Sequence, residues 1–293
     1  MPLPTAITDL STTAASNYPA GSDSPIVLDD VQRAHASFIA QLYATQVANN
    51  LRAYLAGCTM STAGSSATMS IAAGIAMDST NAAMMTLAAL GKTTSAWAVG
   101  TGNGGIDTGA IANSTWYHFY VIRRPDTGVV DVIFSTSASA PTLPASYTQY
   151  RRIGSGKTNG SAQWTKFVQV GDEFLWDVGV LDVNSTTQSS TAVLYTLSVP
   201  TGVQVQAFYN AISSDAGTPS LLFTSPDESD QAPSATAAPL NSVNGISNAT
   251  GNTGGEYRTR TNTSAQIRVR ATASVAFFRI ATRGWVDARG RNA

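Results

Sequence analysis

Hydrophobic and polar residues alternate along two neighbouring segments of the chain, Tyr117–Arg124 and Val129–Phe134. Successive side chains of a β-strand point to opposite faces, so a period of two is typical of a strand with one buried face. The four residues between the segments read PDTG, and these types form tight turns because proline fixes φ and glycine accepts a positive φ. The pattern therefore predicts a β-hairpin.

The same period recurs in short segments separated by turn-forming residues. We expect further strands at Ser95–Val99, Phe174–Val178, Ala192–Val199, Val203–Asn210, Gln266–Ala271 and Ser274–Ala281. Tyr147–Ile153 and Trp164–Val170 also alternate, and Asn159-Gly160 between them favours a tight turn with positive φ, which predicts a second hairpin. Short strands with little helix between them indicate a mainly β fold of one or more antiparallel β-sandwich modules, jelly-roll-like in build.

One helix is predicted ahead of these strands, within residues 28–50. Residues three or four positions apart form a stripe on it, with Val31, Phe38 and Leu42 as its large apolar members. The stripe either packs on the helix's own domain or makes a symmetric contact between subunits, so these three residues are the candidate subunit contact. His35 lies on the same stripe, and we interpret it as a buried histidine rather than a metal ligand.

The remaining regions differ in composition. The first 25 residues are rich in Pro, Ser, Thr and Ala without a sustained period, which predicts an extended arm. Ser213–Gly255 is polar and predicts long surface loops. A polar stretch at 177–190 marks a boundary. We therefore expect an arm and helix for anchoring and oligomerisation at 1–50, a first β-sandwich module at 51–180, and a second module with long polar loops at 181–293. Whether the two modules form one body stays open.

The composition limits the partners that we expect. A formal net charge of −1 argues against nucleic acid, whose binding relies on an excess of Lys and Arg. The N-terminus lacks the pattern of a secretory signal, and the uncharged stretch Ala53–Met77 is broken by Ser, Thr and Gly, so we expect cytoplasmic synthesis without membrane insertion. Cys58 is the only cysteine, which excludes an intrachain disulfide.

The segment GSGKT at 154–158 matches the end of a phosphate-binding loop. Such a loop needs another glycine five residues before Gly156, where this chain has Arg151, and a helix after Thr158, where it has Asn-Gly-Ser. GTGNGG at 100–105 matches a dinucleotide fingerprint by letters alone, because no helical pattern follows it. We interpret both segments as turns and predict neither nucleotide binding nor a cofactor.

The acidic residues and histidines do not form a recognisable catalytic or metal-binding pattern. Asp172-Glu173 and the acids at 227–230 lie in turns and loops, where adjacent side chains point to different sides, so we interpret them as solvated. His35 and His118 have no nucleophile elbow near them. The sequence therefore predicts a protein that is not an enzyme, with no catalytic, cofactor-binding or metal residues.

The end of the chain is locally basic, since eight of the 17 basic residues fall between 258 and 291. In QIRVRA at 266–271, we expect the apolar residues to face the core and the arginines to face outward. These arginines form either a solvated strand face or a surface for phosphate-bearing cell-surface glycan or an acidic neighbour. The candidate basic contact surface consists of Arg258, Arg260, Arg268 and Arg270.

Several stretches together resemble one protein family. The segment from His118 to Trp176, HFYVIRRPDTGVVDVIFSTSASAPTLPASYTQYRRIGSGKTNGSAQWTKFVQVGDEFLW, resembles one found in tail and tail-fibre-associated proteins of tailed bacteriophages. YTLSVPTGVQVQA, RTNTSAQIRVRA and ATRGWVDARG look like the closing part of such proteins, and TDLSTTAASNYPAGSDSPIVLDDVQRAHASFIAQL is similar to their virion-proximal ends. The resemblance covers most of the chain.

The resemblance implies a structural or host-recognition component of a virion tail, made in the cytoplasm of the host bacterium. It implies a homo-oligomer, with a trimer as the expected form, in contact with other tail or virion proteins and with host surface glycan as a further partner. Two alternatives stay open, a glycan-degrading tail enzyme and a capsid-decorating protein of similar build.

Overall fold

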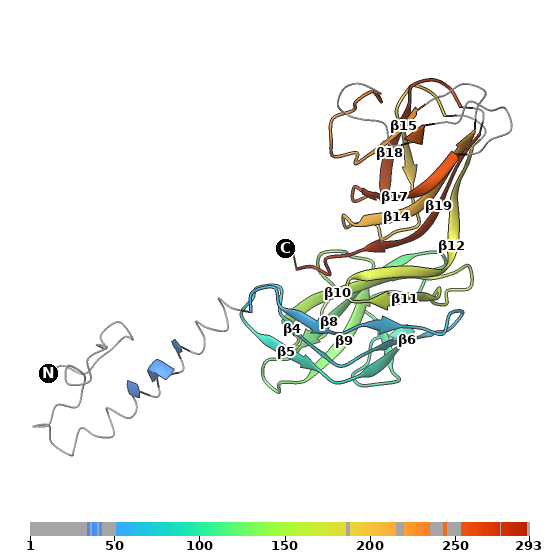
Figure 1. Ribbon diagram of the computed structural model, residues 1–293. Coiled ribbons are helices and arrows are strands. Elements are labelled where there is room, and N and C mark those ends of the chain that lie inside the picture. Colours follow the sequence, from blue (N-terminus) through green and yellow to red (C-terminus); the bar gives the residue numbers. More distant parts are fainter. Residues whose placement is uncertain are drawn as a thin grey trace, which may run out of the picture.

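The computed structural model describes residues 34–35, 37–39, 41–42, 51–185, 188–214, 220–234, 243–244, 253–275 and 277–291 (Figure 1). The predicted class is confirmed, because the described chain is mainly β and its sheets are mostly antiparallel. Residues 34–35, 37–39 and 41–42 are helical, within the predicted helix. The predicted arm at 1–25 and Val31 lie outside the described residues.

Residues 51–166 form what we call the N-terminal body. Its strands are β1 (Leu55–Gly57), β2 (Met60–Ser61), β3 (Thr68–Ile71), β4 (Gly74–Met77), β5 (Met84–Leu87), β6 (Leu90–Ala96), β7 (Gly104–Ile106), β8 (Trp116–Arg123), β9 (Val130–Ser135) and β10 (Gln149–Lys157). They make a three-stranded sheet of order β1-β4-β5 and a seven-stranded sheet of order β10-β8-β9-β7-β6-β3-β2. Only β7 pairs in parallel, with β6 and β9, among these strands.

Strand β8 lies between β10 and β9 in the seven-stranded sheet and is buried on both faces. Its odd-numbered residues 117–121 join the main hydrophobic cluster, while Tyr120 and Ile122 pack with Ile133 and Tyr147 in a second cluster. The predicted hairpin is confirmed, since β8 and β9 pair from His118↔Ser135 to Arg123↔Val130. Gly128 has a φ of 76° in the turn, the conformation for which glycine is suited.

Residues 167–291 form the C-terminal body. Its strands are β11 (Phe167–Val170), β12 (Glu173–Ser185), β13 (Val193–Thr196), β14 (Gln206–Ser214), β15 (Ser220–Thr224), β16 (Val243–Asn244), β17 (Thr253–Arg260), β18 (Gln266–Ala271) and β19 (Phe277–Val286). A five-stranded sheet of order β11-β12-β19-β14-β17 faces a four-stranded sheet of order β13-β18-β15-β16. Aromatic contacts such as Tyr209 with Phe223, at 5.6 Å between ring centroids, fill the space between them.

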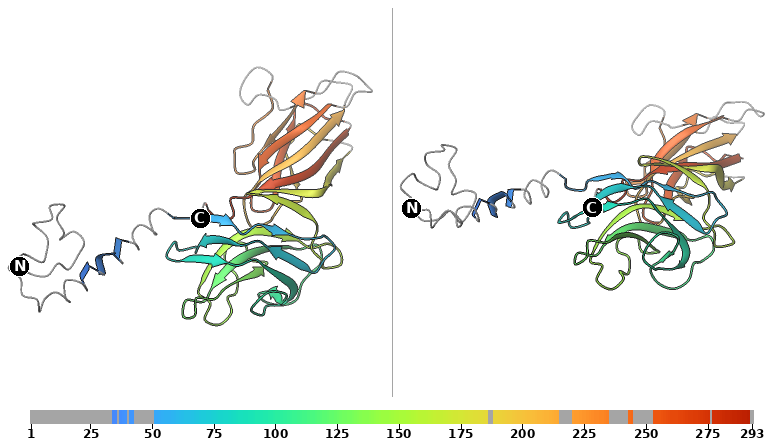
Figure 2. Two further views of the ribbon diagram at one scale, coloured as in Figure 1. Left: turned by 60° about the horizontal axis from the view of Figure 1, so that its bottom comes forward. Right: turned by 90° about the horizontal axis from the view of Figure 1, so that it is seen from below.

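An aromatic cluster joins the two bodies at their junction. Trp116 of β8 contacts Trp176 of β12 and Trp285 of β19, with ring centroids 5.8 and 5.4 Å apart. Phe174 stacks on Trp285 at 5.1 Å and an interplanar angle of 4°. One hydrophobic cluster consequently runs from Leu55 through the junction into the C-terminal body. The bodies lie end to end, and the chain returns to the junction after β19 (Figures 1 and 2).

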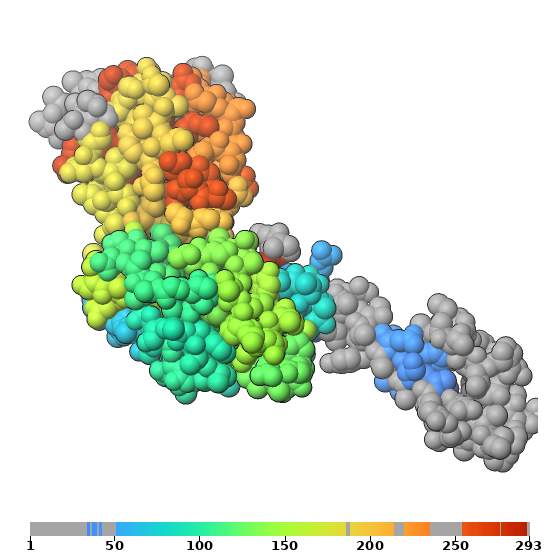
Figure 3. Space-filling model, turned by 180° about the vertical axis from the view of Figure 1, so that it is seen from behind, coloured from blue at the N-terminus to red at the C-terminus, as the bar shows by residue number. Residues whose placement is uncertain are grey.

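The predicted boundary at 177–190 falls largely within one element, the 13-residue strand β12. This strand begins beside the N-terminal body, where it pairs with β11, and continues along β19 to Ser185. The two bodies are in direct contact when seen from behind (Figure 3). The strand therefore belongs to the junction rather than to a linker.

The predicted second hairpin is wrong. Tyr147–Ile153 contributes to β10, which pairs with β8, whereas Trp164–Val170 contributes to β11, which pairs with β12. A single bridge between Thr158 and Trp164 closes the loop between them. The positive φ in that loop, 57°, belongs to Ala162 rather than to Asn159 or Gly160.

The expectation of surface loops throughout Ser213–Gly255 is also wrong at one point. Leu221, Leu222 and Phe223 are buried in β15, which pairs with β18. The segment has few apolar residues, but these three adjacent ones are enough to form a core strand. Burial of each such side chain is worth about 1.5–3 kcal/mol.

Candidate functional site

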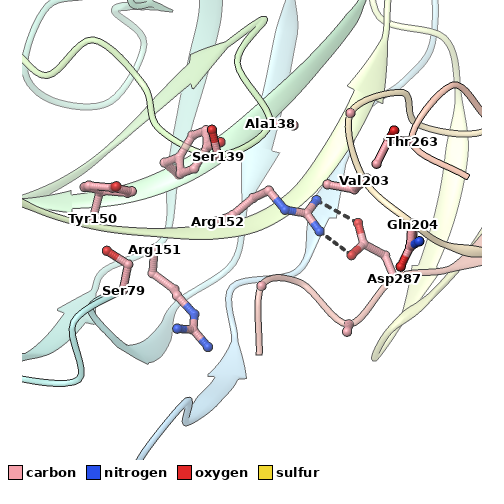
Figure 4. Close-up of a pocket in the computed structure, with 14 residues that line it drawn as sticks. Ser79, Ala138, Ser139, Tyr150, Arg151, Arg152, Val203, Gln204, Thr263 and Asp287 are labelled. Carbon is pink, nitrogen blue, oxygen red and sulfur yellow. Dashed lines mark hydrogen bonds and ion pairs between the residues drawn. The ribbon is translucent and has the colours of Figure 1, made fainter. Parts of the chain in front are cut away.

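Two hollows in the surface of the described residues lie beside the chain segment that follows β19. One hollow has a volume of 440 Å³ and is lined from β10 by Arg151 and Arg152 (Figure 4). The other has a volume of 450 Å³ and is lined from β17 by Arg260. The hollows share Gln204 and Ala288 in their walls. We call the two together the junction furrow.

A buried ion pair forms one wall of the furrow. Arg152 Nη1 donates a hydrogen bond to Asp287 Oδ2 at 2.8 Å, and Nη2 bonds the other carboxylate oxygen, so the contact is bidentate (Figure 4). Asp287 is 1% exposed and also accepts a hydrogen bond from the Arg289 amide at 2.7 Å. Burial alone would raise the pKa of Asp287, but the charge and hydrogen bonds of Arg152 hold that pKa below its ordinary value.

Arg152 also reaches a serine and histidine behind the furrow. His118 Nδ1 lies 2.9 Å from Ser155 Oγ, and Arg152 Nη1 donates to the same oxygen at 3.1 Å. In the tautomer of His118 that carries its proton on Nε2, the serine hydroxyl accepts from Arg152 and donates its own proton to His118 Nδ1. Ser155 is 0% exposed in strand β10, so its hydroxyl has no face open to a substrate. The contact has the residue types of a nucleophilic pair but the geometry of a structural link.

We expect His118 to stay uncharged down to a pH of about 4, because burial and then the positive charge of Arg152 lower its pKa. The unfolded chain protonates this residue near pH 6.5, so it binds more protons than the folded chain between about pH 4 and 6.5. Stability should therefore fall as the pH is lowered through that window. An NMR titration of the imidazole checks this, and a midpoint near 6.5 would contradict it. The same loss of stability should be smaller in His118→Gln.

The segment after β19 is tied to the N-terminal body by Arg289. Its Nη2 donates to the carbonyls of Gly57 and Cys58, both at 2.8 Å, and its Nε donates to Ile153 at 2.7 Å. Arg291 pairs with Asp172 on the turn between β11 and β12. These two arginines of the basic C-terminal region therefore have internal partners. Burial raises the pKa of the neighbouring Cys58 thiol to about 11, which makes it a poor nucleophile.

Two further arginines of the furrow take part in none of the ion pairs found among the described residues. Arg151 is 1% exposed; its Nη2 donates to Ala53 at 3.3 Å, and its Nε has no hydrogen-bond partner in the described chain. Arg260 is exposed at the end of β17. It pairs across the sheet with Gln206 of β14, and Gln206 pairs on its other side with Val286 of β19, so the three residues form a cross-strand row. All three residues of this row line the second hollow.

The four arginines of the candidate basic surface do not lie together. Arg258 and Arg260 alternate on β17 with the buried Thr259, so they project from the outer face of the five-stranded sheet. Arg268 and Arg270 project from the outer face of the four-stranded sheet, as the alternation of β18 predicts.

Three of these arginines have partners within the described residues. Arg258 covers the ring of Phe208 at 4.3 Å. Arg268 bonds backbone carbonyls of the 225–228 loop, and Arg270 pairs with Asp230. Only Arg260 of the four lines the furrow.

The candidate subunit contact is described in part. Phe38 is 4% exposed within the single chain, whereas Leu42 is 49% exposed. His35 is exposed, which contradicts its interpretation as a buried histidine. The apolar surface left for a partner is therefore formed by Leu42 and the neighbouring Ile39, which is 69% exposed.

All of the GSGKT segment except Thr158 lies in β10, where Gly154, Gly156 and Lys157 pair with Phe119, Tyr117 and Trp116 of β8. Its glycines leave room for neighbouring side chains: a Cβ on Gly154 would lie 2.7 Å from the Met60 methyl carbon. Lys157 Nζ lies 5.8 Å from the Trp116 ring centroid. The residues that resemble a phosphate loop thus take part in sheet packing.

Comparison with family models, curated proteins and solved structures finds no match to this chain. Among the described residues, His, Cys, Asp and Glu form no group of three that could hold a metal ion. In the same part of the chain, no helix is long and apolar enough to span a membrane.

Sequence reasoning missed the furrow and its ion pair. The sequence contained one signal for buried arginines. Arg151 and Arg152 are adjacent in an alternating strand, so their side chains must point to opposite faces of the sheet. Both faces of β10 are covered at this point, so both arginines are buried. The partner Asp287 lies 135 residues away, and nothing local links it to β10.

Proposed function

We propose that the chain is a non-enzymatic structural component of a bacteriophage tail, such as a fibre, a fibre-attachment protein or a host-recognition protein. It acts as a homo-oligomer, with a trimer as the expected form, and it contacts other tail proteins. Cell-surface glycan is its expected external ligand. Its place is the virion rather than the cell.

This proposal rests on where the segment from His118 to Trp176, which resembles phage tail proteins, lies in the fold. The segment starts in β8, passes through β9, β10 and β11, and ends in β12. It therefore includes strands of both bodies and three members of the junction's aromatic and polar network, His118, Arg152 and Trp176. Because the similar residues lie in core strands, we take the resemblance to concern the whole architecture rather than one surface motif.

The polar groups of the junction also support a structural role. Ser155 Oγ is shared by His118 and Arg152, and Asp287 is neutralised by Arg152, so these groups satisfy one another inside the protein. A catalytic group instead needs free reach to a substrate atom.

Immunogold labelling of phage particles tests the proposal. Antibodies raised against residues 51–291 should label the tails of particles from the source culture, at fixed positions. Labelling of the capsid would favour the decorating protein instead, and the absence of the chain from purified particles would overturn the proposal. Incubation with host polysaccharide should leave its chain length unchanged, whereas shortening would favour the glycan-degrading enzyme.

The exposed side of the helix gives a test of oligomerisation. Leu42→Asp places a charge on the apolar surface left open by the single chain, and we expect light scattering to show a shift from trimer toward monomer, because a buried charge is costly at a subunit contact. Gln41→Asp is the matched control on an exposed neighbouring position. A monomeric wild-type chain, or equal effects of the two variants, would contradict this prediction.

A further inference from the structure

We propose that the junction furrow binds an acidic carbohydrate, with Arg260 contacting a carboxylate group and the buried charge of Arg151 adding to the positive potential of the furrow. The identity of the ligand as a sugar rests on the proposed role at a cell surface. Its negative charge is inferred from the furrow itself.

The charge of the furrow differs from that of the whole chain. Four arginines and two aspartates line the two hollows, which gives the furrow a net charge of +2, whereas the chain has a net charge of −1. The aspartates are already engaged, Asp287 with Arg152 and Asp172 with Arg291. The positive charge that is left belongs to Arg151 and Arg260.

Arg151 is the more informative of the two. Moving a guanidinium out of water is costly unless its donors are bonded, because the charge loses its hydration. Arg151 is 1% exposed, its one hydrogen bond is 3.3 Å long, and no bond satisfies its Nε within the described residues. Burial accordingly lowers its pKa. The charge of Asp78 opposes this effect of burial. A carboxylate in the hollow would add a further compensating charge.

The neutral side chains of the furrow suit a ligand with many hydroxyl groups. Ser79, Ser139, Thr263 and Gln204 line the first hollow together with the ring of Tyr150 (Figure 4). Hydroxyls and amides can donate to and accept from sugar hydroxyls, and an aromatic ring can cover an apolar face of a sugar. The second hollow shares Gln204 and Ala288 with the first, and Gln206 lies beside Arg260 in its wall. Two adjoining hollows suit an oligosaccharide, whose successive units can occupy both, better than a single ion.

A nucleic acid is a poorer fit to the same surface. Phosphate backbones are bound by many cationic side chains along a groove. Only two arginines of the furrow are without a carboxylate partner among the described ion pairs. The limited positive charge together with the hydroxyl-rich wall therefore favours a carboxylated sugar.

Calorimetry with oligogalacturonate tests the proposal, and the methyl-esterified form of the same oligomer is the matched ligand without charge. We expect binding of the acid form and loss of that binding on esterification. Arg260→Gln should weaken binding about tenfold, the effect expected for one charge-assisted hydrogen bond. Arg283→Gln, at an exposed arginine of β19 outside the furrow, should change the affinity less than about twofold. Because Arg260 is exposed, its replacement should leave the thermal unfolding midpoint unchanged.

Four outcomes would overturn the inference. One is no binding of oligogalacturonate or of oligosialic acid, and another is equal binding of the acid and esterified forms. The third is tighter, Arg260-dependent binding of a single-stranded DNA oligomer, which would assign the furrow to nucleic acid. Sulfate and phosphate serve as free-anion probes, and binding of these ions alone would contradict the sugar. The outcome is separable from the proposed function, because tail labelling of particles does not depend on the furrow.

Discussion

Replacing Asp287 with alanine is expected to destabilise the folded chain by about 3–5 kcal/mol, because it leaves the Arg152 guanidinium buried without its partner. Asp287 is 1% exposed and Arg152 is 8% exposed, so the guanidinium would have little access to water in the intact fold. The Arg289 amide would lose its acceptor as well. Urea unfolding followed by tryptophan fluorescence measures the change.

The exposed pair of Arg124 and Asp126 provides the control. Asp126→Ala removes the same chemical group from a solvent-exposed ion pair, and its unfolding midpoint should match that of the wild type. Equal effects of the two variants would show that burial of the Arg152–Asp287 pair does not matter. The pKa of Asp287 is held below its ordinary value, so its contribution is complete above the unfolded-state pKa and is lost as the pH falls through the folded-state pKa.

Trp285→Ala should also cost about 3–5 kcal/mol, the usual range for truncation of a large buried aromatic side chain. Trp285 is 0% exposed and contacts Trp116, Phe174 and Trp176, so its removal opens a cavity where the two bodies meet. We expect a lower unfolding midpoint by circular dichroism, together with earlier proteolysis at the junction.

Val178→Ala is the control for this variant. Val178 lies in the same strand as Trp176 but is 76% exposed, so its truncation should change stability by less than about 0.5 kcal/mol. A similarly small effect of Trp285→Ala would mean that the aromatic cluster does not hold the bodies together.

Those parts of the fold that depend on neighbouring residues could be predicted from the sequence. The β8–β9 hairpin follows from alternation and a four-residue turn, and β18 has the predicted bounds and outward arginines. The wrong hairpin shows the limit of this reasoning. Alternation identified β10 and β11 as strands, but their sheets are chosen by the partners β8 and β12. Those pairings depend on packing across the whole chain.

The candidate site was harder to predict for the same reason. Arg260 was singled out with three other arginines, and only the sheet register separates it from them. His118 and Ser155 face each other because β10 has an irregularity between Arg152 and Gly154, which shifts the pairing by one residue. A bulge of this kind re-aims side chains without a clear local signal. Asp287 meets Arg152 only after the chain has completed both bodies.

The strand pair β12–β19 has a mechanical consequence. At its start it lies beside the N-terminal body, and it then runs to the far part of the C-terminal body, a span of roughly 40 Å for the 13 residues of β12. Tension applied between the two bodies along this direction loads the ladder hydrogen bonds in shear, so that many bonds bear the force together. Tension across the strands would instead open the ladder one bond at a time. The molecule should therefore resist pulling along its length far better than bending at the junction.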